Sequence, residues 1–145
     1  MKLFLNQLTD YEKGEILDYK HVYFVGLRAE KIKGSPREPH NQGYDDERGE
    51  YRVALHDHLA YRYEVLEVLG SGSFGQALKC FDYKRNEEVA LKIIRNKKRF
   101  HHQAAIEAKV VKFIRDHDPE QTAHLVTMKE FFVFRNHFVQ GSSYA

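Results

Sequence analysis

The sequence predicts an α+β domain, in which an antiparallel β-sheet packs against one long helix. Three strand-type runs, around 61–69, 76–83 and 88–94, follow one another with only tight turns between them, which is typical of an antiparallel meander. The run 103–117 then repeats apolar residues at helical spacing, and 124–134 returns to strand composition.

The first 32 residues predict a small α/β segment that precedes this sheet. Thr9 is a candidate N-cap and Glu12, three residues later, completes a capping box, so a helix is expected over 8–19. We expect Ile16 and Leu17 to face inward from this helix.

The next two stretches predict a strand and then a linker. The run 21–27 is rich in β-branched and aromatic residues, so a strand is expected there. From 33 to 50 apolar side chains almost vanish while Pro, Gly and charged residues accumulate, which indicates a surface linker. The acidic residues Asp45, Asp46 and Glu47 fall in this linker and need no role beyond solvation. A short strand is expected around 51–55, after the linker.

Composition narrows the classes of function. A chain of 145 residues with 42% hydrophobic and 30% charged residues predicts one soluble globular domain. The net charge of +2 is too small to indicate a nucleic-acid surface, and no apolar run reaches the length of a membrane span. Cys80 is the only cysteine, so no internal disulfide is possible, and we expect it in or near the core. These features predict a cytoplasmic or nuclear protein without a nucleic-acid or membrane partner.

Nine histidines raise the question of a metal site. His56 and His58 alternate along the chain, whereas His101 and His102 are adjacent at a helix start, so neither pair predicts converging ligands. Structural or solvent roles are therefore favoured, and no metal site is predicted. The basic run 95–99 is compatible with a nuclear-localisation signal, although a solvated connection before the helix is the favoured interpretation.

The stretch LGSGSFGQA, 69–77, has three glycines at G-x-G-x-x-G spacing, which indicates a backbone that approaches a phosphate. A dinucleotide-binding fold would need a helix directly after the glycines. The run 76–83 is too short for that helix and ends in turn signals. A glycine loop that closes a β-hairpin over a nucleotide is the alternative, and it predicts a lysine on the next strand.

The expected lysine is present. VALK places Lys92 on the strand after the hairpin, and Glu107 follows on the predicted helix, where it can pair with the lysine. Phe74 lies at the tip of the loop and is expected to cover the site from water. An accidental glycine-rich turn beside a surface lysine is the competing interpretation, and three linked features at suitable distances disfavour it.

Together these motifs resemble the small lobe of a eukaryotic protein kinase. The segment 8–34 is similar to the N-terminal accessory segment of the class II dual-specificity tyrosine-regulated (DYRK) kinases, and 44–70 is similar to their DH-box region and first kinase strand. IRNKKRFHHQAAIE and FRNHF are also family-like, so the resemblance covers residues 8–138 and leans towards the fourth-member type.

The resemblance implies an ATP site. Lys92 would hold the α- and β-phosphates and Glu107 would pair with it, while Ala77 departs from the usual Val and should weaken adenine packing by about 1 kcal/mol. The family implies tyrosine autophosphorylation and protein serine/threonine substrates, with Mg²⁺, for a complete kinase only. The residues that the resemblance places around ATP are Leu69, Gly70, Ser71, Gly72, Ser73, Phe74, Gly75, Gln76, Ala77, Ala90, Lys92 and Glu107.

The sequence contains neither an H-R-D-x-x-x-x-N nor a D-F-G motif, so no catalytic residue is assigned. The resemblance divides the chain into an accessory segment and linker (1–50), a DH-box region (51–62), a small lobe (63–138) and an unrelated tail (139–145). We expect this lobe to be truncated before its fifth strand, which would leave the strand 88–94 with an open edge. ATP binding is then expected to be weak at best, without catalysis.

Two alternatives remain open at this stage. The segment 1–60 could engage a full-length kinase or its scaffolds, which would make the chain a non-catalytic interaction module or competitor. Alternatively, the chain is a fragment of an active protein kinase.

Overall fold

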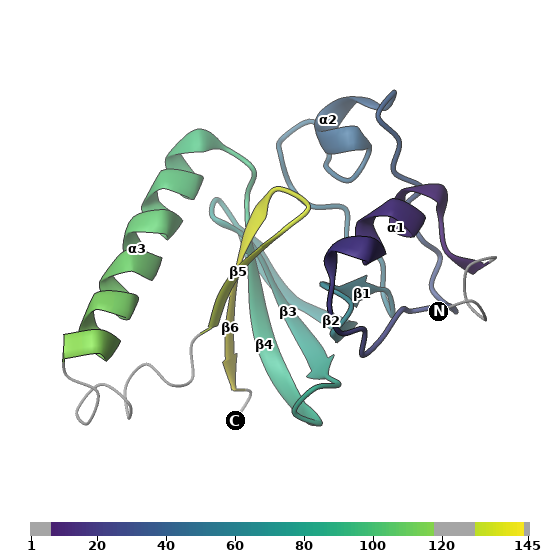
Figure 1. Ribbon diagram of the computed structural model, residues 1–145. Coiled ribbons are helices and arrows are strands. Elements are labelled where there is room, and N and C mark those ends of the chain that lie inside the picture. Colours follow the sequence, from purple (N-terminus) through teal and green to yellow (C-terminus); the bar gives the residue numbers. More distant parts are fainter. Residues whose placement is uncertain (1–6, 118–129, 144–145) are drawn as a thin grey trace.

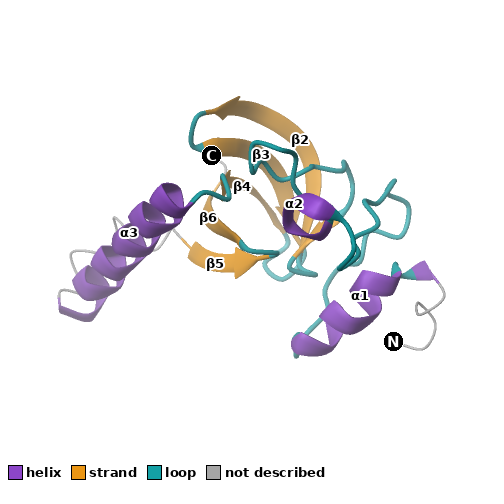
Figure 2. Cartoon of the chain, turned by 90° about the horizontal axis from the view of Figure 1, so that it is seen from above, coloured by secondary structure: helices purple, strands orange, loops and turns teal. Residues whose placement is uncertain are grey.

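A computed structural model describes residues 7–117 and 130–143, which form one six-stranded antiparallel sheet flanked by helical segments (Figure 1). The strand order is β1-β2-β3-β4-β6-β5. The long helix lies on one side of the sheet and the N-terminal segment on the other, as the view from above also shows (Figure 2). The elements are α1 (Asp10–Glu15), η2 (Ile16–Asp18), α2 (Pro39–Gln42), β1 (His58–Leu59), β2 (Tyr63–Gly72), β3 (Gly75–Asp82), β4 (Glu87–Ile94), α3 (Lys98–His117), β5 (Glu130–Phe134) and β6 (His137–Ser143).

The meander β2-β3-β4 supplies the centre of the core, as the sequence predicts. Alternate residues of β4 face inward, so Val89, Leu91 and Ile93 are all buried. Leu78 and Cys80 of β3 pack into the same cluster and are fully buried, which confirms the prediction for Cys80. Burying each large apolar side chain of this kind stabilises the fold by about 1.5–3 kcal/mol.

The expected truncation before a fifth strand is wrong. Residues 137–143 form β6, which lies between β4 and β5 and pairs with both. A strand between two others is held by main-chain hydrogen bonds on both sides and needs only a buried residue on its inward face, not an apolar composition throughout. In β6 this buried residue is Val139, which is 1% exposed. Gly141 suits the crowded position beside Leu91, because a Cβ there would lie 3.0 Å from Leu91 Cδ2. The strand β4 therefore has a partner on each side.

The capping box at the N-terminus is confirmed. The Glu12 amide donates to Thr9 Oγ1, and the Thr9 amide donates to Glu12 Oε1. The helix is shorter than predicted, since α1 ends at Glu15 and a 3₁₀ turn follows. Ile16 is buried as expected, but Leu17 is 76% exposed, so that prediction is wrong. Neighbouring residues of a short helix point in different directions, and only one of them can face the sheet.

The strand predicted at 21–27 is also wrong. The segment has no regular secondary structure up to residue 26, and the amides of Tyr23 and Phe24 both donate to the same carbonyl, that of Tyr61, instead of forming a ladder. Its aromatic residues are used in packing, because the Phe24 ring stacks on Tyr83 at a centroid distance of 4.6 Å. The aromatic residues of 21–27 therefore contribute packing contacts, and the segment is not a strand of the sheet.

The segment 33–50 is more than a surface linker. Tyr44 and Asp45 are buried, with exposures of 1% and 5%, so a solvated role for Asp45 is wrong. Two buried residues among many exposed ones leave the average hydropathy of the segment low, which hides them from a pattern search. The strand expected around 51–55 is reduced to a single bridge between Asp45 and Tyr51.

The predicted helix and last strand are confirmed where the structure describes them. Helix α3 begins at Lys98, before the predicted start, and its apolar residue Ile106 is 50% exposed. The strand predicted at 124–134 is present as β5 from Glu130, and 118–129 lie outside the described residues. Within the described ranges no helix is both long and apolar enough to cross a bilayer.

If β6 is part of the core, Val139→Ala should lower the free energy of unfolding by about 2 kcal/mol, because it removes two buried methyl groups. Urea denaturation followed by circular dichroism measures this change. The matched control is Val133→Ala on the neighbouring strand, where the side chain is 57% exposed and the change should stay within about 0.5 kcal/mol. Equal effects of the two substitutions would mean that 139–143 do not form a packed strand.

Candidate functional site

The glycine motif closes a β-hairpin. Gly72 pairs with Gly75 where β2 turns into β3, and Gly70 pairs with Ala77 further along the ladder. This geometry excludes the strand-to-helix turn of a dinucleotide-binding fold and agrees with the hairpin interpretation. Gly75 has φ +140°, and a Cβ there would lie 2.0 Å from the Ile93 carbonyl oxygen. Only glycine lets the hairpin lie this close to β4.

Lys92 lies below the hairpin on β4, directly opposite Ala77 of β3. Its ammonium is 4.5 Å from the centroid of the Phe74 ring, a cation–π contact between the loop tip and the lysine. The half-buried Phe74 ring thus lies against the lysine, and its role in covering a nucleotide stays a prediction.

Glu107 approaches the same place from α3. Its carboxylate accepts a hydrogen bond from Gln140 Nε2 at 3.1 Å, and Gln140 is paired with Lys92 across β4 and β6. Gln140 therefore connects the α3 glutamate to the lysine strand. The Lys92–Glu107 ion pair itself remains a prediction.

The remaining predicted positions surround this hairpin. Leu69 is 43% exposed and the loop residues from Gly70 to Ser73 are exposed, while Ala90 is half-buried on β4. Their role around a nucleotide remains a prediction. The hairpin positions other than the glycines and Phe74 are Leu69, Ser71, Ser73, Gln76 and Ala77.

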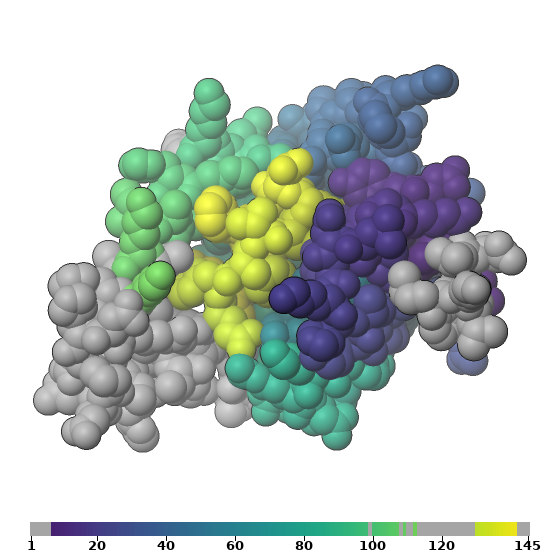
Figure 3. Space-filling model, in the orientation of Figure 1, coloured from purple at the N-terminus to yellow at the C-terminus, as the bar shows by residue number. Residues whose placement is uncertain are grey.

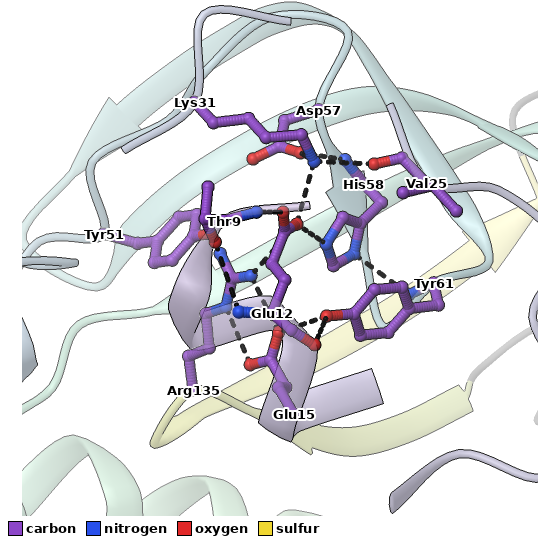
Figure 4. A network of polar contacts seen from close by, with 10 residues as sticks. All are labelled: Thr9, Glu12, Glu15, Val25, Lys31, Tyr51, Asp57, His58, Tyr61 and Arg135. Atoms are coloured by element: carbon purple, nitrogen blue, oxygen red, sulfur yellow. Dashed lines mark hydrogen bonds and ion pairs between the residues drawn. The ribbon is translucent and has the colours of Figure 1, made fainter. Parts of the chain in front are cut away.

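A buried ion pair joins Arg135, in the turn between β5 and β6, to Glu15 of the N-terminal segment (Figure 4). Arg135 donates from Nε and Nη2 to the two carboxylate oxygens of Glu15, at 2.9 and 2.8 Å, and from Nη1 to the Tyr51 hydroxyl. The guanidinium also lies 4.0 Å from the centroid of the Tyr44 ring. Arginine suits this position because its planar fork binds a carboxylate with two hydrogen bonds and stacks on aromatic rings.

The turn between β5 and β6 places the Arg135 side chain against Glu15 and Tyr51. Arg135 and Asn136 both have positive φ, 47° and 66°, as in a two-residue hairpin turn. Asn136 donates to Asn41 Oδ1, and His137 contacts Asp45, so three consecutive residues of the hairpin bind the N-terminal half of the chain. The FRNH stretch is therefore a connector between the sheet and the segments before it.

Glu12 is the centre of a second buried cluster. Lys31 Nζ lies 2.8 Å from Glu12 Oε2 and 2.9 Å from Asp57 Oδ1, and His58 Nε2 donates to the same Glu12 oxygen. Burial alone would favour the neutral carboxyl group, but hydrogen bonds from His58, Lys31 and the Thr9 amide lower the pKa of Glu12 to about 2.

The donor atoms of Glu12, Asp57 and His58 lie within 4.8 Å of one another, which is close enough to hold a metal ion. The Lys31 ammonium already lies between the two carboxylates and neutralises them, and Val25 O is its third acceptor. A cation would therefore have to displace a fully coordinated lysine, and the cluster is better explained as structural.

The comparisons with known proteins agree with this geometry. No family model matches the chain. The chain is 56% identical to dual specificity tyrosine-phosphorylation-regulated kinase 4 of Homo sapiens, over 95% of its own length and 26% of that protein. It is 49% identical to dual specificity tyrosine-phosphorylation-regulated kinase mbk-2 of Caenorhabditis elegans, over 90% of its length and 16% of the relative. It is 52% identical to DYRK-family kinase pom1 of Schizosaccharomyces pombe, over 90% of its length and 12% of the relative.

By sequence, the chain belongs to the DYRK kinase family. It spans about a quarter or less of the length of these curated relatives. The match extends over nearly all of the chain, so it includes the N-terminal segment as well as the sheet.

Two buried histidines of this DYRK-family chain differ in their hydrogen-bond partners. His58 accepts the Tyr61 amide at Nδ1 and therefore keeps its proton on Nε2, which makes it neutral. Burial lowers the pKa of His58, which agrees with a neutral ring. His137, in contrast, contacts an oxygen with each nitrogen, the Ile94 carbonyl with Nδ1 and the Asp45 carboxyl group with Nε2.

Pattern analysis missed Arg135, Glu15 and Lys31, because charged residues in short runs are normally solvated. One available signal was an arginine placed directly after the apolar run FFVF. Its partner lies 120 residues away in the chain, and no local spacing could have indicated it.

The pKa of Glu12 predicts a specific pH dependence of stability. Its folded pKa of about 2 is below the ordinary 4.5, so its contribution is present above about pH 4.5 and is lost as the pH falls towards 2. The full contribution is about 3 kcal/mol. Glu12→Gln should therefore lower stability at pH 7 and flatten the decline below pH 5.

Urea titrations at a series of pH values would measure this effect. The matched control is Glu47→Gln, which removes an exposed carboxylate and should leave the whole profile unchanged. An unchanged acid limb in Glu12→Gln would show that Glu12 titrates normally in the folded chain.

Proposed function

We propose that this chain provides the phosphate-binding half of a DYRK-type protein kinase ATP site. The observation that carries the proposal is the convergence of three elements: the glycine hairpin closes over β4, Lys92 lies beneath the Phe74 ring, and Glu107 approaches from α3 through Gln140. Such a hairpin can place main-chain amides near phosphates, with a compact cation opposite them. Membership of the DYRK family supports the same interpretation.

In this proposal the chain binds ATP weakly, because it supplies only the phosphate-binding half of the site, and it transfers no phosphate alone. A kinase also needs an aspartate base and metal-binding residues, and this sequence carries no H-R-D-x-x-x-x-N or D-F-G motif. Phosphorylation of protein serine and threonine with Mg²⁺ and ATP, and tyrosine autophosphorylation, are proposed for a complete kinase that contains such a lobe.

A non-catalytic role as partner or competitor of a full-length kinase is a second candidate. We infer that any such role belongs to the whole chain rather than to 1–60. Glu12 and Glu15 of that segment both form ion pairs with the buried Arg135 of the β5–β6 turn. Deleting 1–60 would leave Arg135 as a buried unpaired charge, so point substitutions in the intact chain are the appropriate test.

Isothermal titration calorimetry with ATP tests the nucleotide proposal. We expect a dissociation constant weaker than about 1 μM, and Lys92→Met should weaken it by about tenfold or more because a charge-assisted contact to phosphate is lost. Lys79→Met is the matched control, since Lys79 lies on β3, pairs with Glu88 and should leave the affinity unchanged.

Two results would contradict the proposal. A sub-micromolar dissociation constant for ATP would contradict the expected weak binding. Equal effects of the two lysine substitutions on ATP affinity would contradict the assignment of Lys92 as the phosphate-binding lysine. A kinase assay with Mg-ATP and a generic protein substrate would overturn the non-catalytic part if the purified chain transferred phosphate.

A further inference from the structure

A cleft of about 530 Å³ lies between the N-terminal segment and the last strand of the sheet. One wall is formed by residues 19–21 and Tyr23, and the other by Glu130 to Val133 of β5, with Tyr63 and Lys84 also in the lining. Figure 3 shows the N-terminal segment (purple) and the β5–β6 hairpin (yellow) side by side on this face. The cleft is separate from the glycine hairpin and from the buried ion pairs.

The cleft runs along the edge of β5. Four consecutive residues of this strand, from Glu130 to Val133, line it. Consecutive side chains of a strand point to opposite faces, so one groove can touch all four only where it follows the main chain. Within the described residues the sheet ends at β5, which has β6 on its inner side and no strand on its outer side.

The charges that face the cleft are predominantly positive. Lys20 and Lys84 are exposed in its walls, and neither forms an ion pair in the described part of the chain. His21 lies beside Lys20 and is also exposed. The two remaining charged groups of the lining are already engaged, which leaves the lysines as the available charges.

The first engaged group is Arg62, which is held by both carboxylate oxygens of Asp82, at 2.8 and 2.7 Å. The second is Glu130, the acid of the cleft, which binds Arg85 and accepts a hydrogen bond from the Tyr63 hydroxyl. An entering negative group would therefore meet two free ammonium groups and an acid that is already neutralised.

The cleft also has an aromatic wall. The rings of Tyr63 and Phe132 stack at a centroid distance of 5.7 Å, and Tyr23 is 39% exposed on the opposite side. An unpaired strand edge, an aromatic wall and free lysines together match an extended peptide with alternating acidic and apolar side chains. An uncharged peptide would make no ion pair with the two lysines. A small isolated anion would contact neither the strand edge nor the aromatic rings.

We propose that this cleft binds an extended acidic peptide segment of a partner protein, which adds to the outer edge of β5. Main-chain hydrogen bonds to β5 would hold the segment, and Lys20 and Lys84 would select its carboxylates. This inference does not depend on nucleotide binding, because none of its residues belongs to the candidate ATP site.

Fluorescence anisotropy with the full chain tests the proposal. The probe is a labelled peptide, Glu-Val-Glu-Phe-Glu-Val-Glu, which presents carboxylates on one side of a strand and apolar groups on the other. Its glutamine counterpart lacks the charge, and a version with N-methyl groups on alternate residues cannot form the main-chain hydrogen bonds. We expect the acidic probe to bind with a dissociation constant below about 1 mM, and both altered probes to bind at least about tenfold more weakly.

The matched protein variants separate a local charge effect from a general one. The double substitution Lys20→Glu with Lys84→Glu should weaken binding of the acidic probe by about tenfold or more. Lys109→Glu with Lys112→Glu changes the net charge equally on the exposed face of α3 and should stay within about twofold. Circular dichroism confirms that each variant is folded.

Four outcomes of the binding experiments would overturn the proposal. They are no binding of the acidic probe, equal binding of the glutamine probe, undiminished binding of the N-methylated probe, and equal loss in both double variants. Dimerisation that competes with the probe in sedimentation experiments would assign the edge to a second copy of the chain and overturn the acidic-peptide assignment.

Discussion

The buried ion pair between Arg135 and Glu15 is the contact on which the arrangement of the chain depends. It joins residues from the two ends of the described chain, and both side chains are largely shielded from water. Removing one partner of such a pair leaves an unpaired buried charge, which costs about 3–5 kcal/mol. The pair therefore requires the N-terminal segment and the β5–β6 turn to be present together, and it explains why a segment with little regular structure has a fixed position.

The strand β6 connects the Arg135–Glu15 ion pair to the candidate nucleotide site. The turn that carries Arg135 leads directly into His137, whose ring contacts Asp45, and then into Val139 and Gln140 between β4 and β5. Gln140 is beside Lys92 and contacts Glu107. The strand that is anchored by the N-terminal half of the chain thus also carries the side chain that connects α3 to the lysine strand. In this way the N-terminal segment and the sheet form one structural unit.

The central sheet could be predicted from sequence because its signals are local. Alternation in β4, tight turns and the glycine spacing each act within a few residues, so the hairpin and the position of Lys92 followed from them. The capping box of Thr9 and Glu12 was local as well. In contrast, β6 was missed because a strand enclosed by two others needs little apolar composition, and Tyr44 and Asp45 were missed because their burial depends on Arg135 and His137, which are about 90 residues away. Aromatic residues at 21–27 suggested a strand but pack on the sheet instead.

Native-state hydrogen exchange tests the central claim, that the N-terminal segment and the sheet unfold together, most directly. The amides of Lys13 and Tyr23, which donate to Thr9 O and Tyr61 O, report on the segment, and the amides of β4 report on the sheet. The account predicts that both groups exchange with the same free energy of opening and the same dependence on denaturant. Exchange of Lys13 and Tyr23 through a low-energy opening with little denaturant dependence, while β4 stays protected, would contradict it.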